Sequence, residues 1–296
     1  MEIKEGYIDY LGYKTYYRIV NPNGKKTPLV LLHGGPGSTH NSHELFDPLA
    51  YDDDRPLVMY DQIGCGKSSV EGSHKELWRK ETWANELINL REKLNLKEIH
   101  LLGHSWGGML AIIYLCDYAP EGVKSVTLSS TLSSASLWRQ ETHRLINLLD
   151  TRVKNTLLKA EAENDFDSPK VKKAVNYYYH KYVFGPFKKN EVPECLTRKK
   201  PSSKETYETS WGKSEFDPTG TLRDYEYTDK LKNIKCPVML CSGVNDESTP
   251  LQNKIMYENI TSSKKWHLYP NSRHMTYFED NESYMKNLKE FLNENE

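Results

Sequence analysis

The segment spanning residues 103–108, Gly-His-Ser-Trp-Gly-Gly, restricts the possible folds of this chain more than any other segment. An apolar run at 98–102 predicts a strand just before it, and residues 109–118 predict a helix just after it. A serine at such a junction, with glycine two positions away on each side, is typical of a strained turn that lifts the hydroxyl above the sheet edge. We therefore interpret Ser105 as a nucleophile, although the pattern alone is loose enough to occur by chance.

The first 134 residues alternate between short apolar runs and longer helical patterns. Apolar side chains at helical spacing predict a helix over 82–94, and residues 7–20 predict an antiparallel hairpin that turns near Gly12. The alternation is typical of a mostly parallel sheet wrapped by helices. The runs that predict buried strands are 29–32, 57–60 and 125–129.

Between about residues 135 and 234 the pattern changes to amphipathic helical stretches that are rich in aromatic and charged residues, such as 142–149 and 171–182. We therefore predict an α/β core formed by residues 1–134 and 235–296, with residues 135–234 inserted as a helical cap over the site. Two later strand-like runs and a terminal helix lie at 237–241, 265–269 and 283–292.

A serine nucleophile needs a base, and the base needs an orienting carboxylate. In α/β-hydrolases these residues follow the chain order Ser, Asp or Glu, His. Asp246 and His274 occur in this order, each on a loop just after a predicted strand, where open α/β sheets place their sites. Three alternatives stay open here: His274 could be structural, Asp246 could cap a helix, and Glu247 could be the acid instead. We favour Asp246 because it stands four residues before Pro250, as in the Gly-x-x-Asp-x-x-x-Pro loop of such enzymes.

The sequence His-Gly-Gly-Pro-Gly at 33–37 directly follows a predicted strand. Such a loop can direct a backbone N–H group, here that of Gly35, at a developing oxyanion. The N–H group of Trp106, the residue after the nucleophile, would supply the second donor. The alternative is a plain tight turn, since glycine and proline mark turns in any case. The position before the first helix favours the oxyanion loop.

Neither the cysteines nor the Gly-Lys-Ser sequence predicts a cofactor. The five cysteines are an odd number without a Cys-x-x-Cys pair, so we expect free thiols in a reducing cytoplasm, and no zinc spacing is present. A phosphate loop ending in this Gly-Lys-Ser would require glycine where Asp61 stands. We therefore predict no metal and no cofactor, and interpret residues 61–68 as a turn that supports the oxyanion loop.

The charges of the chain nearly balance, with 40 Lys and Arg against 41 Asp and Glu and a formal net charge of −1. This balance argues against nucleic acid or an anionic membrane as a partner. No apolar run is long enough to span a bilayer, and the first residues lack the apolar core of a signal peptide. We therefore expect a soluble, cytoplasmic protein.

Together these segments resemble the proline iminopeptidase, or prolyl aminopeptidase, family of serine peptidases, which has the α/β-hydrolase fold. The resemblance extends over residues 7–292 and is closest to the cytoplasmic enzymes of lactic-acid bacteria and to the tricorn-interacting aminopeptidase of archaea. It implies release of an N-terminal residue, preferentially proline, from short peptides with a free N-terminus. The segments that carry it are 33–37, 61–68, 103–108, 243–250 and His274.

The resemblance also implies that carboxylates bind the α-ammonium group of the substrate. Glu215 aligns with the cap glutamate of the relatives and Glu247 with a second one, and two carboxylates would select a cationic N-terminus. Tyr207 matches a substrate-contacting tyrosine of the archaeal relative. One position departs from the family, because the relatives usually have glycine before the catalytic histidine and this chain has Arg273. The departure bears on the conformation of that loop and on specificity near the leaving group.

These observations lead to the hypothesis of a serine aminopeptidase with Ser105, Asp246 and His274 as its triad. An amino-acid amidase and an esterase on the same fold are the nearest alternatives, and the sequence does not separate peptidase from amidase. The pair of Glu215 and Glu247 argues against a general esterase. A ligand-binding relative without activity is the alternative from another class, and the intact triad argues against it. The sequence makes no prediction of the oligomeric state.

Overall fold

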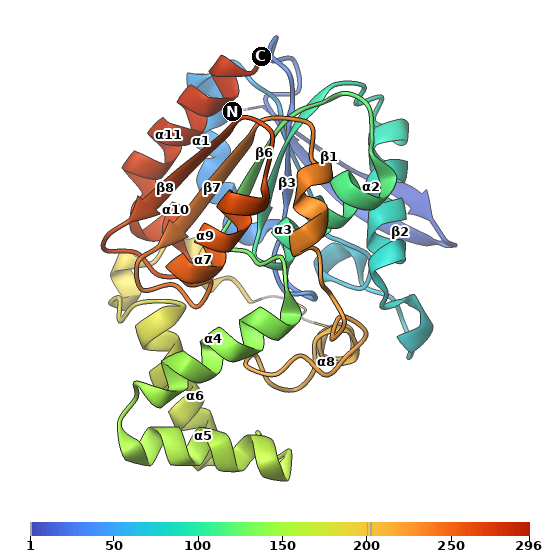
Figure 1. The fold of residues 1–296 in the computed structure, drawn as a ribbon. Coiled ribbons are helices and arrows are strands. Elements are labelled where there is room, and N and C mark those ends of the chain that lie inside the picture. The colour runs from blue at the N-terminus through green and yellow to red at the C-terminus, as the bar shows by residue number, and fades with distance from the viewer. Residues whose placement is uncertain (1, 200, 202) are drawn as a thin grey trace.

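A computed structural model describes residues 2–199, 201 and 203–296 of the chain. Among these residues the strands form one sheet in the order β1-β2-β4-β3-β5-β6-β7-β8 (Figure 1). The pairs β1–β2 and β2–β4 are antiparallel, and all later pairs are parallel, as the alternation of strands and helices predicts. The strands are β1 (Ile3–Tyr10), β2 (Tyr13–Val20), β3 (Leu29–Leu32), β4 (Leu57–Tyr60), β5 (Ile99–His104), β6 (Val123–Ser129), β7 (Val238–Gly243) and β8 (Lys264–Tyr269).

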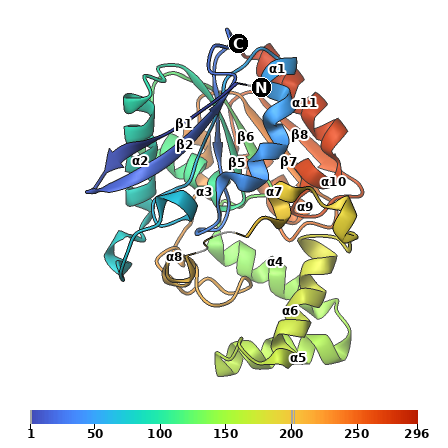
Figure 2. The same cartoon turned by 180° about the vertical axis from the view of Figure 1, so that it is seen from behind.

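Both faces of the sheet are covered by helices, so its central strands are apolar on both sides. Val30 and Leu32 of β3 belong to one cluster of buried side chains, and their neighbours Leu29 and Leu31 belong to the other. Figures 1 and 2 show the helices on the two sides. The first face is covered by α2 (Lys80–Lys93), α3 (Trp106–Ile113) and α9 (Pro250–Asn259), and the second by α1 (Asp47–Asp52), α10 (Thr276–Glu279) and α11 (Asn281–Glu294).

The predicted elements are confirmed, with differences at helix ends. The bounds of β3 and β4 agree with the predicted runs, and the hairpin turns at Leu11 and Gly12, which have φ of 51° and 82°. Positive φ at both central residues is what a tight two-residue hairpin requires. Helix α3 begins three residues before the predicted start, because the helical hydrogen bonding extends back to Ser105, and it continues as a π-helical turn over Tyr114–Tyr118.

The helices of residues 135–234, which we call the helical insert, lie below the sheet in Figures 1 and 2. Near the end of the insert, Tyr227, Leu231 and Ile234 belong instead to the cluster on the first face of the sheet. Side chains of the first three helices of the insert and Phe216 form a separate buried cluster that includes Leu145, Leu157 and Tyr178. Its helices are α4 (Ala135–Asn147), α5 (Thr151–Glu163), α6 (Pro169–Tyr182), α7 (Glu194–Thr197) and α8 (Lys204–Ser210). The 3₁₀ turns of the described chain are His40–Phe46, Gly66–Ser68, Lys75–Leu77, Lys189–Glu191 and Thr228–Asn233.

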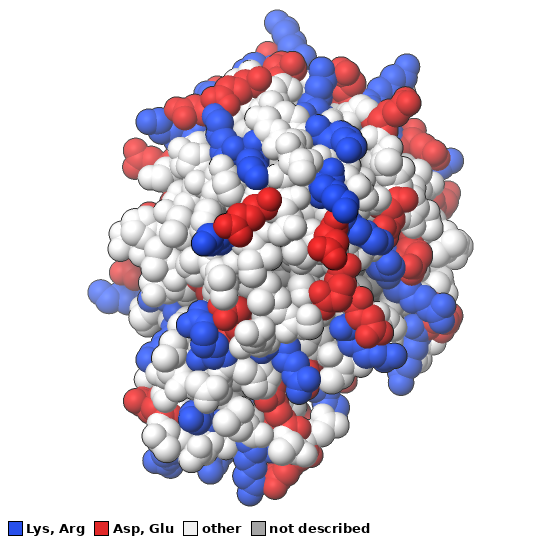
Figure 3. All heavy atoms as spheres, viewed as in Figure 1, with Lys and Arg blue, Asp and Glu red and all other residues white. Residues whose placement is uncertain are grey.

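Acidic and basic side chains are interspersed over the face seen in Figure 3, as the near balance of charge leads one to expect. All five cysteines are free thiols, and three of them, Cys65, Cys195 and Cys241, are buried. No helix in the described part of the chain combines the length and the apolar character needed to cross a membrane.

Candidate active site

Ser105 lies at the junction between β5 and α3 in a conformation that non-glycine residues rarely adopt, with φ of 55° and ψ of −121°. Its N–H group donates to Ser129 O at 2.9 Å, and its carbonyl accepts from Thr131 Oγ1 at 2.7 Å. Strained residues held by their surroundings in this way cluster at functional sites. The turn has the conformation predicted for a nucleophile elbow.

The glycines on either side of Ser105 are required by close contact. A Cβ atom on Gly107 would lie 1.9 Å from Leu32 O in the neighbouring strand, and one on Gly103 would lie 2.3 Å from Gly107 O. Both separations are far below contact distance, so larger residues would push α3 away from the sheet. The Gly-x-Ser-x-Gly spacing in this chain therefore has a steric cause.

Asp246 and His274, from loops that follow β7 and β8, are hydrogen-bonded to each other. His274 Nδ1 lies 2.8 Å from Asp246 Oδ1, and both residues are buried. Asp246 Oδ1 also accepts from Ser248 N at 2.8 Å, which fixes the carboxylate. With Nδ1 facing the carboxylate, Nε2 is the ring nitrogen left for proton transfer. Glu247, the alternative acid considered from sequence, does not make this contact among the described hydrogen bonds.

Ser105 lies beside this pair through its neighbour in the chain. The ring of His104 is 4.9 Å from the ring of His274, centroid to centroid. Among the hydrogen bonds of the described residues there is none between Ser105 Oγ and His274. Such hydrogen bonds often tighten only when a substrate binds.

The loop at 33–37 lies against Ser105. A Cβ atom on Gly34 would be 3.3 Å from Ser105 Cβ, and Gly35 has φ of 119°, which favours glycine. Trp106 is the first residue of α3, so its N–H group has no acceptor within the helix and lies at the positive end of the helix dipole. The two predicted oxyanion donors, Gly35 and Trp106, therefore belong to segments on either side of the serine.

Gln62 connects these two segments. Its N–H group donates to His33 Nε2 at 3.0 Å, and its side-chain Nε2 donates to His33 O at 3.1 Å. On its other side, Gln62 Oε1 accepts from Trp106 Nε1 at 2.7 Å. The turn at 61–68 was expected to support the oxyanion loop, and Gln62 is the residue through which it contacts both the loop and the elbow.

Glu215 and Glu247 form a pair of carboxyl groups near His274. Tyr207 donates its hydroxyl hydrogen to Glu215 Oε2 at 2.5 Å. Burial raises the pKa of Glu215, while the Tyr207 hydroxyl and the charge of His274 oppose the rise. Burial also raises the pKa of Glu247 well above its ordinary value, and the negative charges of Glu215 and Asp246 raise it further. The two carboxyl groups are thus close enough to repel each other when both are ionised.

One oxygen of this pair lacks a partner. Glu247 is 2 % exposed, and its Oε2 has no hydrogen-bond partner of good geometry among the described residues. The same holds for the buried hydroxyl of Tyr178, which nevertheless faces the Glu247 carboxyl group and lowers its pKa through a hydrogen bond of poorer geometry. Buried carboxylates are costly unless they are paired with a cation. The arrangement therefore suits a bound cation.

Aromatic residues surround the carboxyl pair. Trp138 Nε1 and Trp211 Nε1 donate to Glu215 O at 2.8 and 3.2 Å, and the ring of Trp138 is 6.3 Å from that of His274. The Tyr178 and Phe216 rings are 4.5 Å apart. None of these residues was predicted as part of the site, although the aromatic density of the insert, including Tyr177 to Tyr179, was a visible signal.

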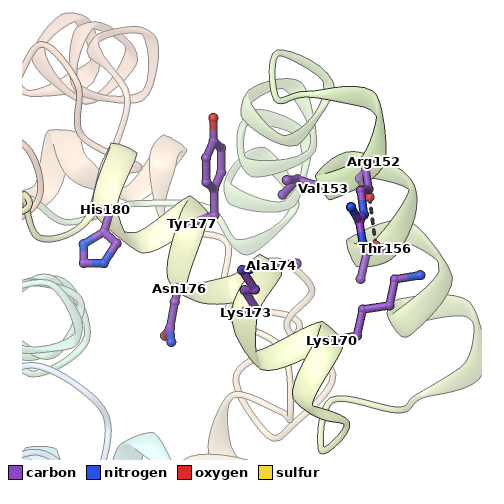
Figure 4. Close-up of a pocket in the computed structure, with 9 residues that line it drawn as sticks. All are labelled: Arg152, Val153, Thr156, Lys170, Lys173, Ala174, Asn176, Tyr177 and His180. Atoms are coloured by element: carbon purple, nitrogen blue, oxygen red, sulfur yellow. Dashed lines mark hydrogen bonds between the residues drawn. The ribbon is translucent and has the colours of Figure 1, made fainter.

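Two pockets in the insert differ in their relation to these residues. A pocket of about 300 Å³ reaches Glu215 and Tyr207 and is also lined by Phe166, Tyr179 and Phe216, among others. A groove of about 410 Å³ between α5 and α6 contains no predicted site residue (Figure 4). Its lining residues are Arg152, Val153, Thr156, Lys170, Lys173, Ala174, Asn176, Tyr177 and His180. Of these two pockets, only the first is lined by predicted substrate-binding residues, and neither is lined by Ser105, Asp246 or His274.

No group of three or more His, Cys, Asp or Glu side chains within residues 2–199, 201 and 203–296 is arranged to hold a metal ion.

The comparison with known proteins agrees with the resemblance seen in the sequence. Residues 27–281 match the model of the alpha/beta hydrolase fold family. A proline iminopeptidase of Lactobacillus acidophilus is 49% identical over 296 residues, which cover 100% of both chains. The chain belongs to the proline iminopeptidase family of α/β hydrolases.

Solved structures support the same assignment of fold. VinJ superposes with a TM-score of 0.90 at 30% identity, over 99% of each chain. A proline iminopeptidase of Mycobacterium smegmatis superposes with a TM-score of 0.88 at 25% identity, over 99% of this chain and 98% of the other. The overall fold described above is thus shared with both of these structures over nearly their whole length.

Proposed function

We propose that the protein is a serine aminopeptidase that releases the N-terminal residue, preferentially proline, from short peptides with a free N-terminus. The observation that carries the proposal is the combination of a hydrogen-bonded Asp246–His274 pair at 2.8 Å with two buried carboxyl groups, of which Glu215 acts electrostatically on both Glu247 and His274. Membership of the proline iminopeptidase family supports it.

In this proposal Ser105 is the nucleophile. Its Oγ attacks the carbonyl carbon of the first residue while His274 Nε2 takes the hydroxyl proton, and Asp246 stabilises the imidazolium that forms. The imidazolium then delivers the proton to the leaving amine as the C–N bond breaks. Water, activated by the same imidazole, attacks the acyl-enzyme and releases the free N-terminal residue.

The N–H groups of Gly35 and Trp106 are proposed to stabilise the oxyanion of the tetrahedral intermediate. Loss of one such donor typically lowers kcat by about 10²–10³. Gln62 would keep the two donors at a fixed separation, because it is hydrogen-bonded to His33 and Trp106 at once.

Glu215 and Glu247 are proposed to bind the α-ammonium group of the substrate. A cation between them would offset the burial and the repulsion that raise the pKa of Glu247, and would give its Oε2 a partner of good geometry. Tyr207 takes a narrower role than the one expected from sequence, because its hydroxyl is already donated to Glu215. Tyr207 would orient the Glu215 carboxylate, and the substrate would contact Glu215 rather than Tyr207.

We further propose that the helical insert, residues 135–234, is a cap over a core formed by residues 1–134 and 235–296. Within the insert, the ring of Trp138 packs near that of His274, and both Trp138 and Tyr207 donate hydrogen bonds to Glu215. A cap of this kind would exclude water and define the length of peptide that fits. The enzyme would act on cytoplasmic peptides.

A panel of fluorogenic aminoacyl coumarinyl amides, free and N-acetylated, tests the proposal on wild type and S105A. We expect the free prolyl substrate to be cleaved fastest and its acetylated form about 100-fold more slowly, because acetylation removes the charge that the carboxylates bind. S105A should lose about 10⁴-fold or more in kcat and should not be labelled by a fluorophosphonate.

Equal cleavage of free and acetylated substrates would refute the ammonium site. Turnover by S105A at the wild-type rate would refute the nucleophile. A preference for simple acyl esters over aminoacyl amides would favour the esterase alternative instead.

A further inference from the structure

The carboxyl-terminal end of α6 lies on the two loops that carry Asp246 and His274. Tyr182, the last residue of α6, accepts two hydrogen bonds through its carbonyl oxygen, from Glu247 N at 3.2 Å and from His274 N at 3.3 Å. The final carbonyl groups of a helix have no partner within the helix. Here one of them joins segments that are 27 positions apart along the chain, so the end of α6 and both loops have a fixed relative position.

Arg273 adds a second link between the same parts. Its Nε donates to His180 O at 3.0 Å, so the guanidinium binds another terminal carbonyl of α6. A cation at this end of a helix is also favoured by the helix dipole. Arg273 directly precedes His274, so a force on its side chain is transmitted to the backbone of the histidine.

Glu279 completes the arrangement from α10. Its carboxylate accepts from Gly185 N at 3.1 Å and from Arg273 N, and it lies 3.4 Å from Arg273 Nη1. The Glu279 side chain is 3 % exposed and that of Arg273 is 24 % exposed, so this ion pair is shielded from water to a degree that surface pairs are not. A Cβ atom on Gly185 would lie 2.9 Å from Arg273 Nη1, which shows how closely the guanidinium packs on the chain after α6.

Aromatic packing supports the contact beside it. The rings of Phe184 and Phe278 stack at 5.5 Å with an interplanar angle of 11°, and Phe187 packs against the edge of Phe278 at 4.9 Å. These contacts join the segment after α6 to α10, the helix that bears Glu279. The hydrogen bonds of Arg273 and Glu279 therefore lie beside a packed aromatic contact between the same two segments.

We propose that Arg273 and Glu279 are positioning residues that hold the backbone of His274 to the end of α6, so that the histidine and the helical insert are placed together. Neither residue touches the substrate in this scheme. Arg273 acts by keeping His274 at the distance that proton transfer from Ser105 requires, and Glu279 acts by orienting Arg273 and the turn at Gly185. The inference rests on the proposed catalytic function of His274.

The variants R273A, R273K and E279Q test the proposal, with R139A as the matched control. Arg139 lies in the insert and, like Arg273, is ion-paired, in its case to Asp217 at 3.0 Å, but its side chain is 61 % exposed and is not linked to either loop. For each protein we would measure kcat and KM on the free prolyl coumarinyl amide, the second-order rate of fluorophosphonate labelling of Ser105, and Tm.

We expect R273A to lower kcat about 10-fold or more with KM changed less than about threefold, since misplacement of a catalytic group by a fraction of an ångström is costly to the chemical step. R273K, which keeps the charge and can still reach His180 O, should recover part of the loss. E279Q should resemble R273A, and the double variant should be little worse than either single one because the residues act as a unit. R139A should stay within about twofold of wild type.

The proposal is overturned if R273A keeps kcat within about twofold of wild type, or if R139A loses as much as R273A. Should R273A not fold, the kcat of E279Q, which is expected to resemble R273A, decides in the same way. The labelling rate separates this failure from failure of the proposed function: a wild type that does not cleave prolyl amides refutes the function, whereas labelling that is equally fast in wild type and R273A refutes the positioning.

Discussion

The two sides of the candidate site treat their buried polar groups in opposite ways. On the core side, Asp61 accepts from His40 N at 2.9 Å, from His40 Nδ1 at 2.7 Å and from Lys67 N at 2.8 Å. On the insert side, Tyr178 of α6 faces Glu247 of the loop after β7, and neither Glu247 Oε2 nor the Tyr178 hydroxyl has a hydrogen bond of good geometry among the described residues. Paired groups stabilise a geometry, whereas an unpaired buried group costs about 1–3 kcal/mol and is kept where a ligand supplies the partner.

The pKa values express the same difference. Burial raises the pKa of Asp61, but the hydrogen bonds and charge of His40 outweigh it and leave the pKa below its ordinary value. For Glu247, burial and neighbouring negative charges act in the same direction, and the pKa is raised well above its ordinary value. The core side is thus built for stability and the insert side for binding, and variants on the two sides should separate these properties.

The largest effect is expected on the binding side, from E247Q. We expect kcat/KM for free prolyl substrates to fall about 100-fold, because a carboxylate partner of the ammonium group is lost, while acetylated substrates change little. The thermal stability should rise at pH 8. The raised pKa of Glu247 means that its ionisation opposes folding above the unfolded pKa, and glutamine does not ionise.

Steady-state kinetics and thermal melts of E247Q measure both changes, and E208Q is the matched control. Glu208 lies on α8 of the helical insert and is ion-paired with Lys204 at 3.5 Å. An E247Q enzyme with unchanged kcat/KM, or with a Tm that falls, would contradict the contrast between the two sides.

The opposite outcome is expected on the core side, from Q62A. Removal of the amide leaves Trp106 Nε1 without its acceptor at 2.7 Å and releases His33 O from its donor at 3.1 Å. We expect kcat to fall about 10-fold with KM nearly unchanged, because the oxyanion donors lose their spacing. The Tm should fall by about 3–8 °C, which corresponds to about 1–3 kcal/mol for a buried unpaired donor.

Kinetics and melts on Q62A, with Q140A on an exposed part of α4 as the control, measure these changes. A rise in KM with kcat intact would mean that Gln62 contributes to substrate binding. The proposed division between a stabilising core side and a binding insert side would then be wrong.

The smallest effect concerns Glu86, a fully buried core residue of α2. Its carboxylate accepts from Thr15 Oγ1 at 2.5 Å and from Ile63 N at 2.9 Å, yet burial raises its pKa to about 8. Between the ordinary value of 4.5 and about 8, the folded protein keeps this proton and the unfolded chain releases it. The free energy of unfolding should therefore fall with rising pH over this range because of Glu86.

Denaturant unfolding of wild type and E86Q at pH 6 and pH 8 tests the sign. The wild type should lose about 1–2 kcal/mol more than E86Q between the two pH values, since the raised pKa values of Glu215 and Glu247 are common to both proteins and cancel. Equal pH dependence in the two proteins would show that Glu86 is ionised in both folded and unfolded states.

The parts of the fold that the sequence predicts are those determined by local pattern. The strands β3 and β4 are four-residue apolar runs buried on both faces, and their bounds agree with the prediction. The segment around Ser105 was recognisable because its glycines are required where α3 packs too closely on the sheet to leave room for a Cβ atom. The order of Asp246 and His274 along the chain was likewise informative, since each follows a parallel strand whose end lies at the same edge of the sheet.

What the sequence did not reveal depends on contacts between distant segments. Nothing local in residues 61–68 indicates that Gln62 joins His33 to Trp106. The link from Tyr182 to two loops uses a backbone carbonyl, which every residue has, so no side-chain signal could mark it. The sequence marked Arg273 only as a departure from the family. Its hydrogen-bond and ion-pair partners, His180 and Glu279, could be identified only from the folded structure.

The raised pKa of Glu247 has a consequence for the whole catalytic cycle. Burial and the nearby negative charges favour the neutral form of this carboxyl group, whereas an ammonium group bound beside it favours the ionised form. Binding of the peptide ammonium group therefore favours release of a proton from Glu247, and departure of the product favours its uptake. Proton release and uptake would then accompany peptide binding and product release.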